Sequence, residues 1–201
     1  MNEQSRRILL IYGHPVKDSF SDEIRKYYLQ GAGTSGAEIR ELFLREMHFD
    51  LNFHEGYRGN QELEDVLKKS QQDILWAHHL VFIYPNWWAT FPALLKGFID
   101  RTFLPGFAFK YAKGIKLPEK LLKGRTARLI VTMDSPKWYY KYYVKQPGHN
   151  AMRKGVLNFC GIRPVKINTL GPVKTASGHK KNQWLKKMEA LGRKDGAAVK
   201  S

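Results

Sequence analysis

Cysteine, long apolar runs and, in the second half of the chain, acidic residues are all scarce in this sequence. The single cysteine, Cys160, excludes an internal disulfide and any zinc or iron–sulfur site built from several cysteines. Its apolar setting predicts a buried core thiol rather than a redox centre. No apolar run approaches the ~18–20 residues of a membrane-spanning helix, and the run at residues 8–12 is too short for the core of a secretory signal. We therefore expect a soluble, cytoplasmic protein.

The shortage of acidic residues makes the second half of the chain strongly basic. Residues 110–201 contain 22 lysines and arginines against four acidic residues, residues 1–109 contain 12 against 14, and the net charge is +16. Such a charge suits nucleic acid, an anionic membrane surface or an anionic small molecule. The basic residues are scattered and no nucleic-acid-binding motif is present, so nucleic acid is not the expected partner. The amphipathic pattern of residues 179–191 leaves open a peripheral contact with a membrane or a transporter.

The length of 201 residues suits a single domain. We expect its core to span about residues 7–191, with a frayed tail over 192–201. Apolar runs predict five strands, at residues 7–12, 37–44, 80–84, 127–133 and 162–170. Helical patterns and end signals predict helices at residues 22–30, closed by Gly31, and at 61–78, 92–102, 150–160 and 179–191.

Strands that alternate with helices, each strand a continuous apolar run, predict an α/β fold with a parallel sheet and helices on both of its faces. Five such strands match the three-layer, flavodoxin-like arrangement with strand order 2-1-3-4-5. Ligands in such folds bind outside the carboxyl ends of the strands. We therefore expect the segments that follow strands one, three and four, residues 14–21, 85–89 and 132–143, to converge on one site.

The first of these segments has the features of a phosphate site. Free amides at a helix N-terminus attract anions, and Ser19 and Ser21 add hydroxyl donors beside His14. A simpler interpretation is that one of the serines only caps the helix. The segment contains no GxxxxGK[ST] or GxGxxG pattern, which excludes the common nucleotide-binding loops.

The other two segments are rich in aromatic residues. The adjacent Trp87 and Trp88 suit a flat heteroaromatic ring, although they would also suit packing under the next helix or a subunit contact. Residues 138–143 hold one tryptophan and four tyrosines, with lysines nearby. This composition fits a nucleic-acid stacking surface, a proton donor for a reducible substrate or a dimer interface, and the sequence does not rank the three.

Three stretches carry a resemblance to a known family: HPVKDSFS at residues 14–21, YPNWWATFPALLKGFIDRTFLPGFAF at 84–109 and NFCGI at 158–162. They resemble the flavodoxin-like NAD(P)H:quinone oxidoreductases, which include animal quinone reductases and bacterial stress and potassium-efflux ancillary flavoproteins. The resemblance implies a homodimer with a non-covalent flavin. It implies ping-pong transfer of a hydride from NAD(P)H through that flavin to a quinone or similar flat acceptor.

The resemblance also assigns residues. It places His14, Ser19, Phe20 and Ser21 at the flavin phosphate; Pro85, Asn86, Trp87 and Trp88 beside the ring edge, with backbone amides toward it; and Thr132, Met133, Asp134 and Ser135 on the other side of the ring. Tyr140 takes the position of a tyrosine that relays charge in animal members. FAD and FMN both remain open, and FAD is favoured because bacterial proteins of this size and sequence use it.

The sequence departs from the family pattern in the third segment. The consecutive glycines of the animal members are replaced by Met133, Asp134 and Ser135, and the histidine that partners the tyrosine has no clear counterpart because His149 lies too far along the chain. The sequence does not determine the physiological acceptor or the preference between NADH and NADPH. The alternative function is that of a flavin-binding regulatory subunit of a membrane transporter with little catalysis of its own.

Overall fold

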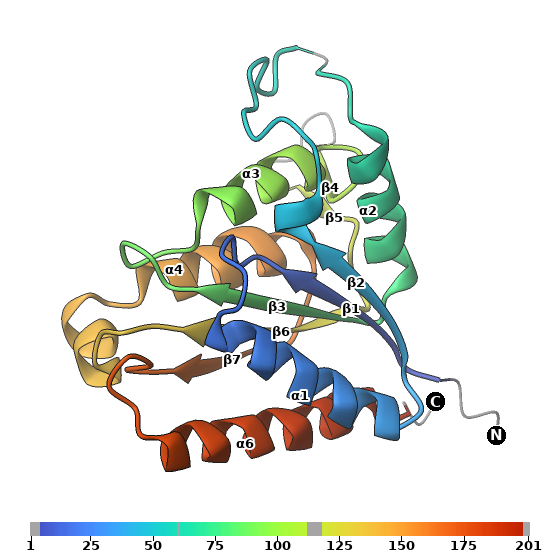
Figure 1. Ribbon diagram of the computed structural model, residues 1–201. Coiled ribbons are helices and arrows are strands. Elements are labelled where there is room, and N and C mark those ends of the chain that lie inside the picture. Colours follow the sequence, from blue (N-terminus) through green and yellow to red (C-terminus); the bar gives the residue numbers. More distant parts are fainter. Residues whose placement is uncertain (1–4, 60, 112–117, 199–201) are drawn as a thin grey trace.

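The computed structural model describes residues 5–59, 61–111 and 118–198 of the chain. Its central sheet contains five parallel strands in the order β2-β1-β3-β6-β7 (Figure 1). These strands are β1 (Arg7–Tyr12), β2 (Glu38–Phe43), β3 (His79–Pro85), β6 (Thr126–Thr132) and β7 (Val165–Leu170). Counted within this sheet alone, the order is 2-1-3-4-5, so the predicted flavodoxin-like arrangement is confirmed.

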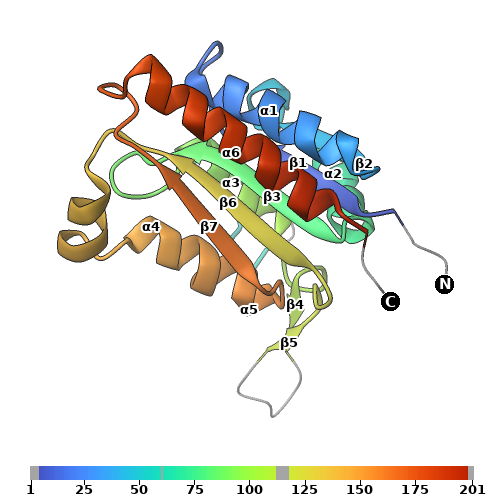
Figure 2. The same ribbon diagram turned by 90° about the horizontal axis from the view of Figure 1, so that it is seen from below.

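Helices cover both faces of the sheet. One face carries α1 (Phe20–Thr34) and α6 (Gly178–Gly196), which lie side by side in both views (Figures 1 and 2). The other face carries α2 (Asp65–Trp76), α3 (Ala93–Thr102) and a helical stretch made of α4 (Pro147–Asn150), η3 (Ala151–Leu157) and α5 (Asn158–Cys160). The chain therefore forms the three layers that the strand–helix alternation predicts.

The strands are apolar throughout because both of their faces are buried. Ile8 and Leu10 of β1 pack in the core under α1 and α6, whereas Leu9 and Ile11 pack in the core under α2 and α3. All four side chains are fully buried. Side chains alternate between the two faces of a strand, so a strand between two helical layers needs apolar residues at every position.

Several short elements complete the described chain. They are the 3₁₀ turn η1 (Leu44–Glu46), the π-helical turn η2 (Tyr139–Tyr143) and a small antiparallel pair, β4 (Phe109–Lys110) and β5 (Glu119–Lys120). Among the described residues, none of the helices combines the length and the apolar character needed to cross a bilayer. Cys160 is buried as predicted, and burial raises the pKa of its thiol to about 12.

Helix α1 continues to Thr34, so the prediction that it ends at Gly31 was wrong. Gly31 lies where α1 crosses α6, and a Cβ at this position would overlap the backbone carbonyl of Glu189. Gly192 of α6 meets α1 in the same way, since its Cβ would overlap the carbonyl of Tyr28. The missing side chains allow the two helix backbones to approach closely. Gly31 therefore serves helix packing rather than helix termination.

Helix α6 extends to Gly196, so the predicted fraying of residues 192–196 was also wrong. Asp195 in its last turn accepts a hydrogen bond of 2.7 Å from Nη2 of Arg128 in β6 and one of 2.9 Å from the Tyr28 hydroxyl. The buried ion pair fixes the end of the helix on the sheet. Residues 199–201 of the expected tail lie outside the described part of the chain.

Two further boundaries differ from the predictions. Helix α2 begins at Asp65 rather than at residue 61, because Arg101 binds the preceding residues as an extended segment: its Nη2 donates to the Glu62 carbonyl and to Glu64 Oε2, both at 2.9 Å. Strand β7 begins at Val165 rather than at residue 162, directly after Pro164, which has no amide hydrogen for a strand ladder.

Candidate functional site

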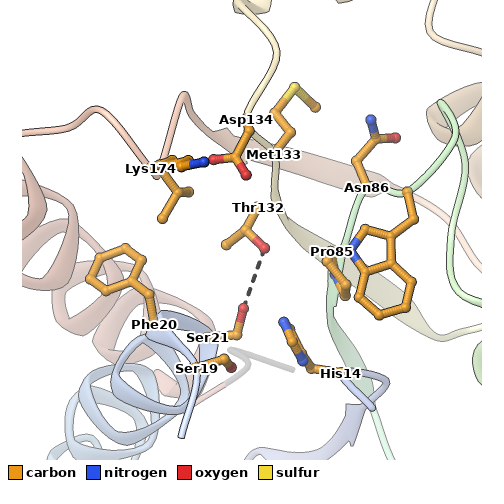
Figure 3. A pocket seen from close by; sticks show the side chains of 12 residues that line it. His14, Ser19, Phe20, Ser21, Pro85, Asn86, Thr132, Met133, Asp134 and Lys174 are labelled. Carbon is orange, nitrogen blue, oxygen red and sulfur yellow. Dashed lines mark hydrogen bonds between the residues drawn. The ribbon is translucent and has the colours of Figure 1, made fainter. Parts of the chain in front are cut away.

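A cavity of about 240 Å³ opens where the carboxyl ends of β1, β3 and β6 meet (Figure 3). The three segments that were expected to converge do meet at this point. The residues that line the cavity are His14, Ser19, Phe20, Ser21, Pro85, Asn86, Trp87, Thr132, Met133, Asp134, Val173 and Lys174. Ten of these twelve belong to the set named from the sequence.

Three named residues do not line the cavity, and two lining residues were missed. Trp88 is 99% exposed, Ser135 is partly exposed beside the cavity, and Tyr140 is buried behind it. The missed residues, Val173 and Lys174, follow β7. Strand β7 is parallel to β6, so its carboxyl end also lies at this edge of the sheet. The predicted fifth strand was therefore enough to suggest that the residues after it, including Val173 and Lys174, line the site.

The N-terminus of α1 supplies hydrogen-bond donors to the cavity. Ser19 is the N-cap, and the first-turn amides of Phe20 and Ser21 have no acceptor within the helix. Asp22 Oδ2 accepts from the amide of Ser19 at 2.9 Å and from its hydroxyl at 3.0 Å. The capping interaction considered from the sequence is therefore present, and it fixes the position of the anion-attracting helix end.

Asp22 is held ionised by its surroundings. Burial on its own would raise the pKa of this carboxyl, but the hydrogen bonds from Ser19 and the guanidinium of Arg45 lower the pKa below its usual value. Arg45 also lies over the ring of Tyr12, 5.2 Å from its centroid. This cluster stabilises the first turn of α1 from the side that faces away from the cavity lining.

Two hydroxyl groups meet across the cavity floor. Ser21 Oγ in α1 lies 3.3 Å from Thr132 Oγ1 at the end of β6, as the dashed line in Figure 3 shows. Both residues are buried. Either hydroxyl can donate to the other, which leaves the second free to donate to a ligand.

His14 is neutral at pH 7. Burial is the main cause that lowers the pKa of its imidazole. Its Nδ1 accepts a hydrogen bond of 3.1 Å from the Val16 amide, so the ring hydrogen lies on Nε2. The ring contacts Trp87 edge to face, with centroids 6.1 Å apart. His14 therefore offers one uncharged N–H donor beside an aromatic wall.

The loop after β3 forms a tight, strained turn. The Trp87 amide donates to the Thr90 carbonyl at 2.9 Å, and the Thr90 amide donates to the Trp87 carbonyl at 3.0 Å. Between them, Trp88 and Ala89 have φ angles of 50° and 62°. The Asn86 amide donates to the Thr132 carbonyl at 2.7 Å. The resemblance implied amides of this loop directed at a ring edge. Those of Asn86 and Trp87 instead bond within the protein, because the loop closes on itself and on β6.

The loops after β6 and β7 are bonded to each other. Val173 donates its amide to the Met133 carbonyl at 3.0 Å, and Lys174 donates its amide to Asp134 Oδ1 at 2.8 Å. A Cβ at Gly171 would crowd the Met133 carbonyl, so a glycine is needed where the two chains cross. Asp134 and Lys174 are the charged side chains among the lining residues, and Figure 3 shows them together on one wall.

Tyr140 lies outside the cavity against His149. Their rings meet edge to face with centroids 4.9 Å apart, and the Tyr140 hydroxyl donates to the Ala89 carbonyl at 3.1 Å. Burial raises the pKa of Tyr140 and lowers the pKa of His149 to about 4. From the sequence, His149 was not assigned as the histidine partner of Tyr140, because it lies too far along the chain. The turns at residues 139–143 and 147–150 nevertheless bring His149 beside Tyr140. No sequence signal marks that contact.

A second cavity, of about 540 Å³, lies away from this edge. Its lining is mostly aromatic and apolar, and includes Phe103, Phe109, Tyr111, Phe159 and Cys160. Although it is larger, it lacks the hydroxyl and helix-end donors of the first cavity. The smaller cavity is therefore the better candidate for a ligand that carries phosphate.

The comparisons with known proteins agree with this fold. The profile of a protein family described as having a flavodoxin-like fold matches residues 6–191. An uncharacterized NAD(P)H oxidoreductase of Haemophilus influenzae is 31% identical over 171 residues, which are 82% of this chain and 83% of that protein.

Solved structures share the fold. The NAD(P)H:quinone oxidoreductase of Methanothermobacter marburgensis superimposes with a TM-score of 0.79 at 22% identity, over 94% of this chain and 98% of the other. An FMN-dependent NADH-azoreductase of Bacillus anthracis, solved in complex with FMN, has a TM-score of 0.73 at 19% identity, over 94% and 99% of the two chains.

Proposed function

Because the chain belongs to the family of proteins with a flavodoxin-like fold, we propose that it is a flavin-dependent oxidoreductase. It would use NAD(P)H to reduce a quinone or a similar flat acceptor. The observation that carries the proposal is the cavity at the carboxyl edge of the sheet. It combines helix-end amides that lack helical acceptors, and the paired hydroxyls of Ser21 and Thr132, with an adjacent aromatic wall. These are the two chemical features that a phosphorylated aromatic cofactor requires.

The phosphate end of a flavin fits the N-terminus of α1. Ser21 and Thr132 supply hydroxyls, the amides of Phe20 and Ser21 lack helical acceptors, and Lys174 supplies a positive charge. A helix N-terminus adds the field of its dipole to these donors.

We place the ring end between the loops after β3 and β6. Pro85, Asn86 and Trp87 would line one side, and Met133 and Asp134 the other, with His14 Nε2 as a donor between ring and phosphate. When bound, the flavin would supply the two-electron carrier that takes a hydride from NAD(P)H and passes it to the acceptor. The protein's own contribution is to bind the cofactor, to orient it and to keep one side of it open.

The identity of the flavin is not fixed by this donor set. The resemblance favoured FAD, but that preference has no support from the comparisons, among which the flavin named is FMN. Ser21 and Thr132 would bind only a phosphate group, which both flavins carry. We therefore propose a flavin of either type.

Tyr140 is better suited to position the loop after β3 than to transfer a proton. Its hydroxyl donates to the Ala89 carbonyl, and its side chain is buried away from the cavity lining. Ala89 follows Trp87 in the strained turn, so this bond holds the aromatic wall in place. We assign Tyr140 as a positioning residue on that ground.

We further propose ping-pong kinetics and a homodimer. NAD(P)H and the acceptor would each enter through the opening of the same cavity, so each would bind after the other has left. The homodimer follows from the resemblance of residues 84–109 to the quinone reductases. Parallel lines in double-reciprocal plots and the mass from light scattering test these two points separately.

The direct test is the cofactor itself. Purified protein should be yellow, mass spectrometry of the heat-released compound should identify FMN or FAD, and the protein should oxidise NADPH or NADH when a quinone is added. Protein that takes up neither flavin would overturn the proposal. Protein that binds flavin but does not oxidise NAD(P)H would favour the alternative of a regulatory flavoprotein.

A further inference from the structure

Five large aromatic side chains are exposed beside the candidate site. Trp88 is 99% exposed, Trp138 66%, Tyr139 39%, Tyr142 62% and Tyr143 74%. We call these five residues the aromatic rim. Single exposed aromatic residues are common, but a group of them on one surface marks a site of interaction.

The rim residues come from two loops, and these loops are hydrogen-bonded to each other. The Ala89 carbonyl, next to Trp88, accepts hydrogen bonds from the Tyr140 hydroxyl at 3.1 Å and from the Gly148 amide at 3.0 Å. The two loops follow β3 and β6, whose carboxyl ends border the cavity, and Figures 1 and 2 show both at the same edge of the sheet. The rim therefore lies beside the mouth of the cavity.

The rim is held rigidly in this exposed state. Tyr139 and Tyr143 stack with ring centroids 5.0 Å apart, and the Val144 amide closes the π-helical turn on the Tyr139 carbonyl at 3.1 Å. Trp88 has a φ of 50°, a conformation that costs free energy in a bulky residue. Trp88 is thus kept in water by a backbone conformation that carries a cost in free energy.

The charge around the rim is positive. Lys137, Lys141 and Lys145 are exposed between the aromatic residues, and Lys141 Nζ lies 4.9 Å from the ring centroid of Tyr142. The acidic residue of this stretch, Asp134, is bonded to the amide of Lys174. Two α6 lysines, Lys180 and Lys187, lie near enough to Lys137 to act with burial in lowering its pKa.

We propose that the aromatic rim docks on the surface of a membrane that contains anionic phospholipid. Tryptophan and tyrosine favour the boundary between headgroups and acyl chains, and lysines beside them bind the negative surface. Nucleic acid is disfavoured because the chain contains no nucleic-acid-binding motif and its basic residues are scattered over several elements.

The proposal has a consequence that rests on the proposed function. A rim that lies on the bilayer places the mouth of the cavity at the membrane surface, where lipid-soluble quinones are concentrated. The acceptor class would then be a quinone with an apolar tail. Vesicle binding itself needs neither turnover nor a quinone, so it can be tested independently of the oxidoreductase activity.

The test is sedimentation of the flavin-loaded protein with vesicles of phosphatidylcholine, alone or mixed with phosphatidylglycerol. Two variants address the rim: Lys141→Glu/Lys145→Glu for its charge, and Trp138→Ser/Tyr142→Ser/Tyr143→Ser for its aromatic residues. The matched control, Lys123→Glu/Lys166→Glu, reverses two exposed lysines that precede or begin strands and so lie at the opposite edge. Light scattering of each protein reports its oligomeric state.

We expect the wild-type protein and the control to bind the mixed vesicles, and each rim variant to bind on the order of tenfold more weakly or worse. Equal binding by rim variants and control would overturn the proposal, as would the absence of wild-type binding to mixed vesicles. A change of oligomeric state in the rim variants without a change in vesicle binding would assign the rim to a second copy instead. Vesicle binding without NAD(P)H oxidation would support the rim as a membrane-docking surface and would contradict only the proposal that the acceptor is a quinone.

Discussion

Arg128 in β6 and Asp195 in the last turn of α6 form a buried ion pair between residues 67 positions apart, with Arg128 Nη2 2.7 Å from Asp195 Oδ1. The pair lies at the amino end of β6, away from the candidate site. His79 of β3 adds to the cluster, with Nε2 3.4 Å from Asp195 Oδ2. One acidic residue thereby joins the C-terminal helix to two central strands.

The first prediction concerns the loss of this charge. Asp195→Asn leaves Arg128 buried without its counter-charge, so we expect the free energy of unfolding to fall by about 3 kcal/mol. Chemical denaturation measures the change. The control is Glu189→Gln in the same helix, which removes an exposed pair with Arg193 and should cost at most about 0.5 kcal/mol. Equal midpoints for the two variants would contradict the anchoring role of Asp195.

The second prediction concerns acid stability. Burial, with the charge of Arg153, lowers the pKa of His149 to about 4, against 6.5 for an unperturbed histidine. Between these values the unfolded chain binds a proton that the folded protein does not, so stability must fall as the pH decreases from 6.5 to 4. We expect His149→Gln to have a shallower decline than wild type in denaturation series across this range. A slope unchanged from that of the exposed control variant His48→Gln would remove His149 as a cause.

The third prediction concerns the cofactor phosphate. Ser19→Asp places a negative charge at the N-terminus of α1 while it keeps a good helix cap, so flavin binding should weaken by about tenfold or more. Ser19→Asn is the matched control, because asparagine caps equally well without a charge. Fluorescence titration of the apoprotein with flavin gives both dissociation constants. Identical constants for the two variants would exclude a phosphate at this helix end.

The fourth prediction concerns Tyr140. Tyr140→Phe removes the hydrogen bond to the Ala89 carbonyl, so we expect a loss of about 1 kcal/mol in stability and a kcat within about tenfold of wild type. The Michaelis constant for the acceptor should rise more than kcat falls, because the aromatic wall is displaced. A kcat reduced by several orders of magnitude, with stability unchanged, would instead make Tyr140 the proton relay.

The features that the sequence predicted well are those set by local patterns. The unbroken apolar run at residues 8–11 is enough to predict a strand buried on both faces, and parallel strands bring the segments that follow them to one edge. Ser19, directly before the helical residues that begin at Phe20, marks a helix start for the same local reason. The position of the cavity and most of its lining follow from these two facts.

The features that it missed depend on contacts between distant residues. A glycine that ends a helix and a glycine that permits a helix crossing look alike in sequence, so Gly31 was misinterpreted. The amides of Asn86 and Trp87 are engaged because Thr132 and Thr90 present carbonyls to them, which no pattern within the loop reveals. His149 contacts Tyr140 because the chain between them forms two turns, and no local pattern at either residue predicts that contact.

The crossing of Gly31 and Gly192 sets the depth at which α1 lies on the sheet. A larger side chain at either position would overlap the backbone of the other helix and increase the distance between the two helices. The resulting tilt of α1 would displace its N-terminal end, which carries Ser19 and Ser21. The donors of the phosphate site would then move although nothing near them had changed. Remote glycines of this kind belong to the binding geometry as much as the hydroxyls that touch the ligand.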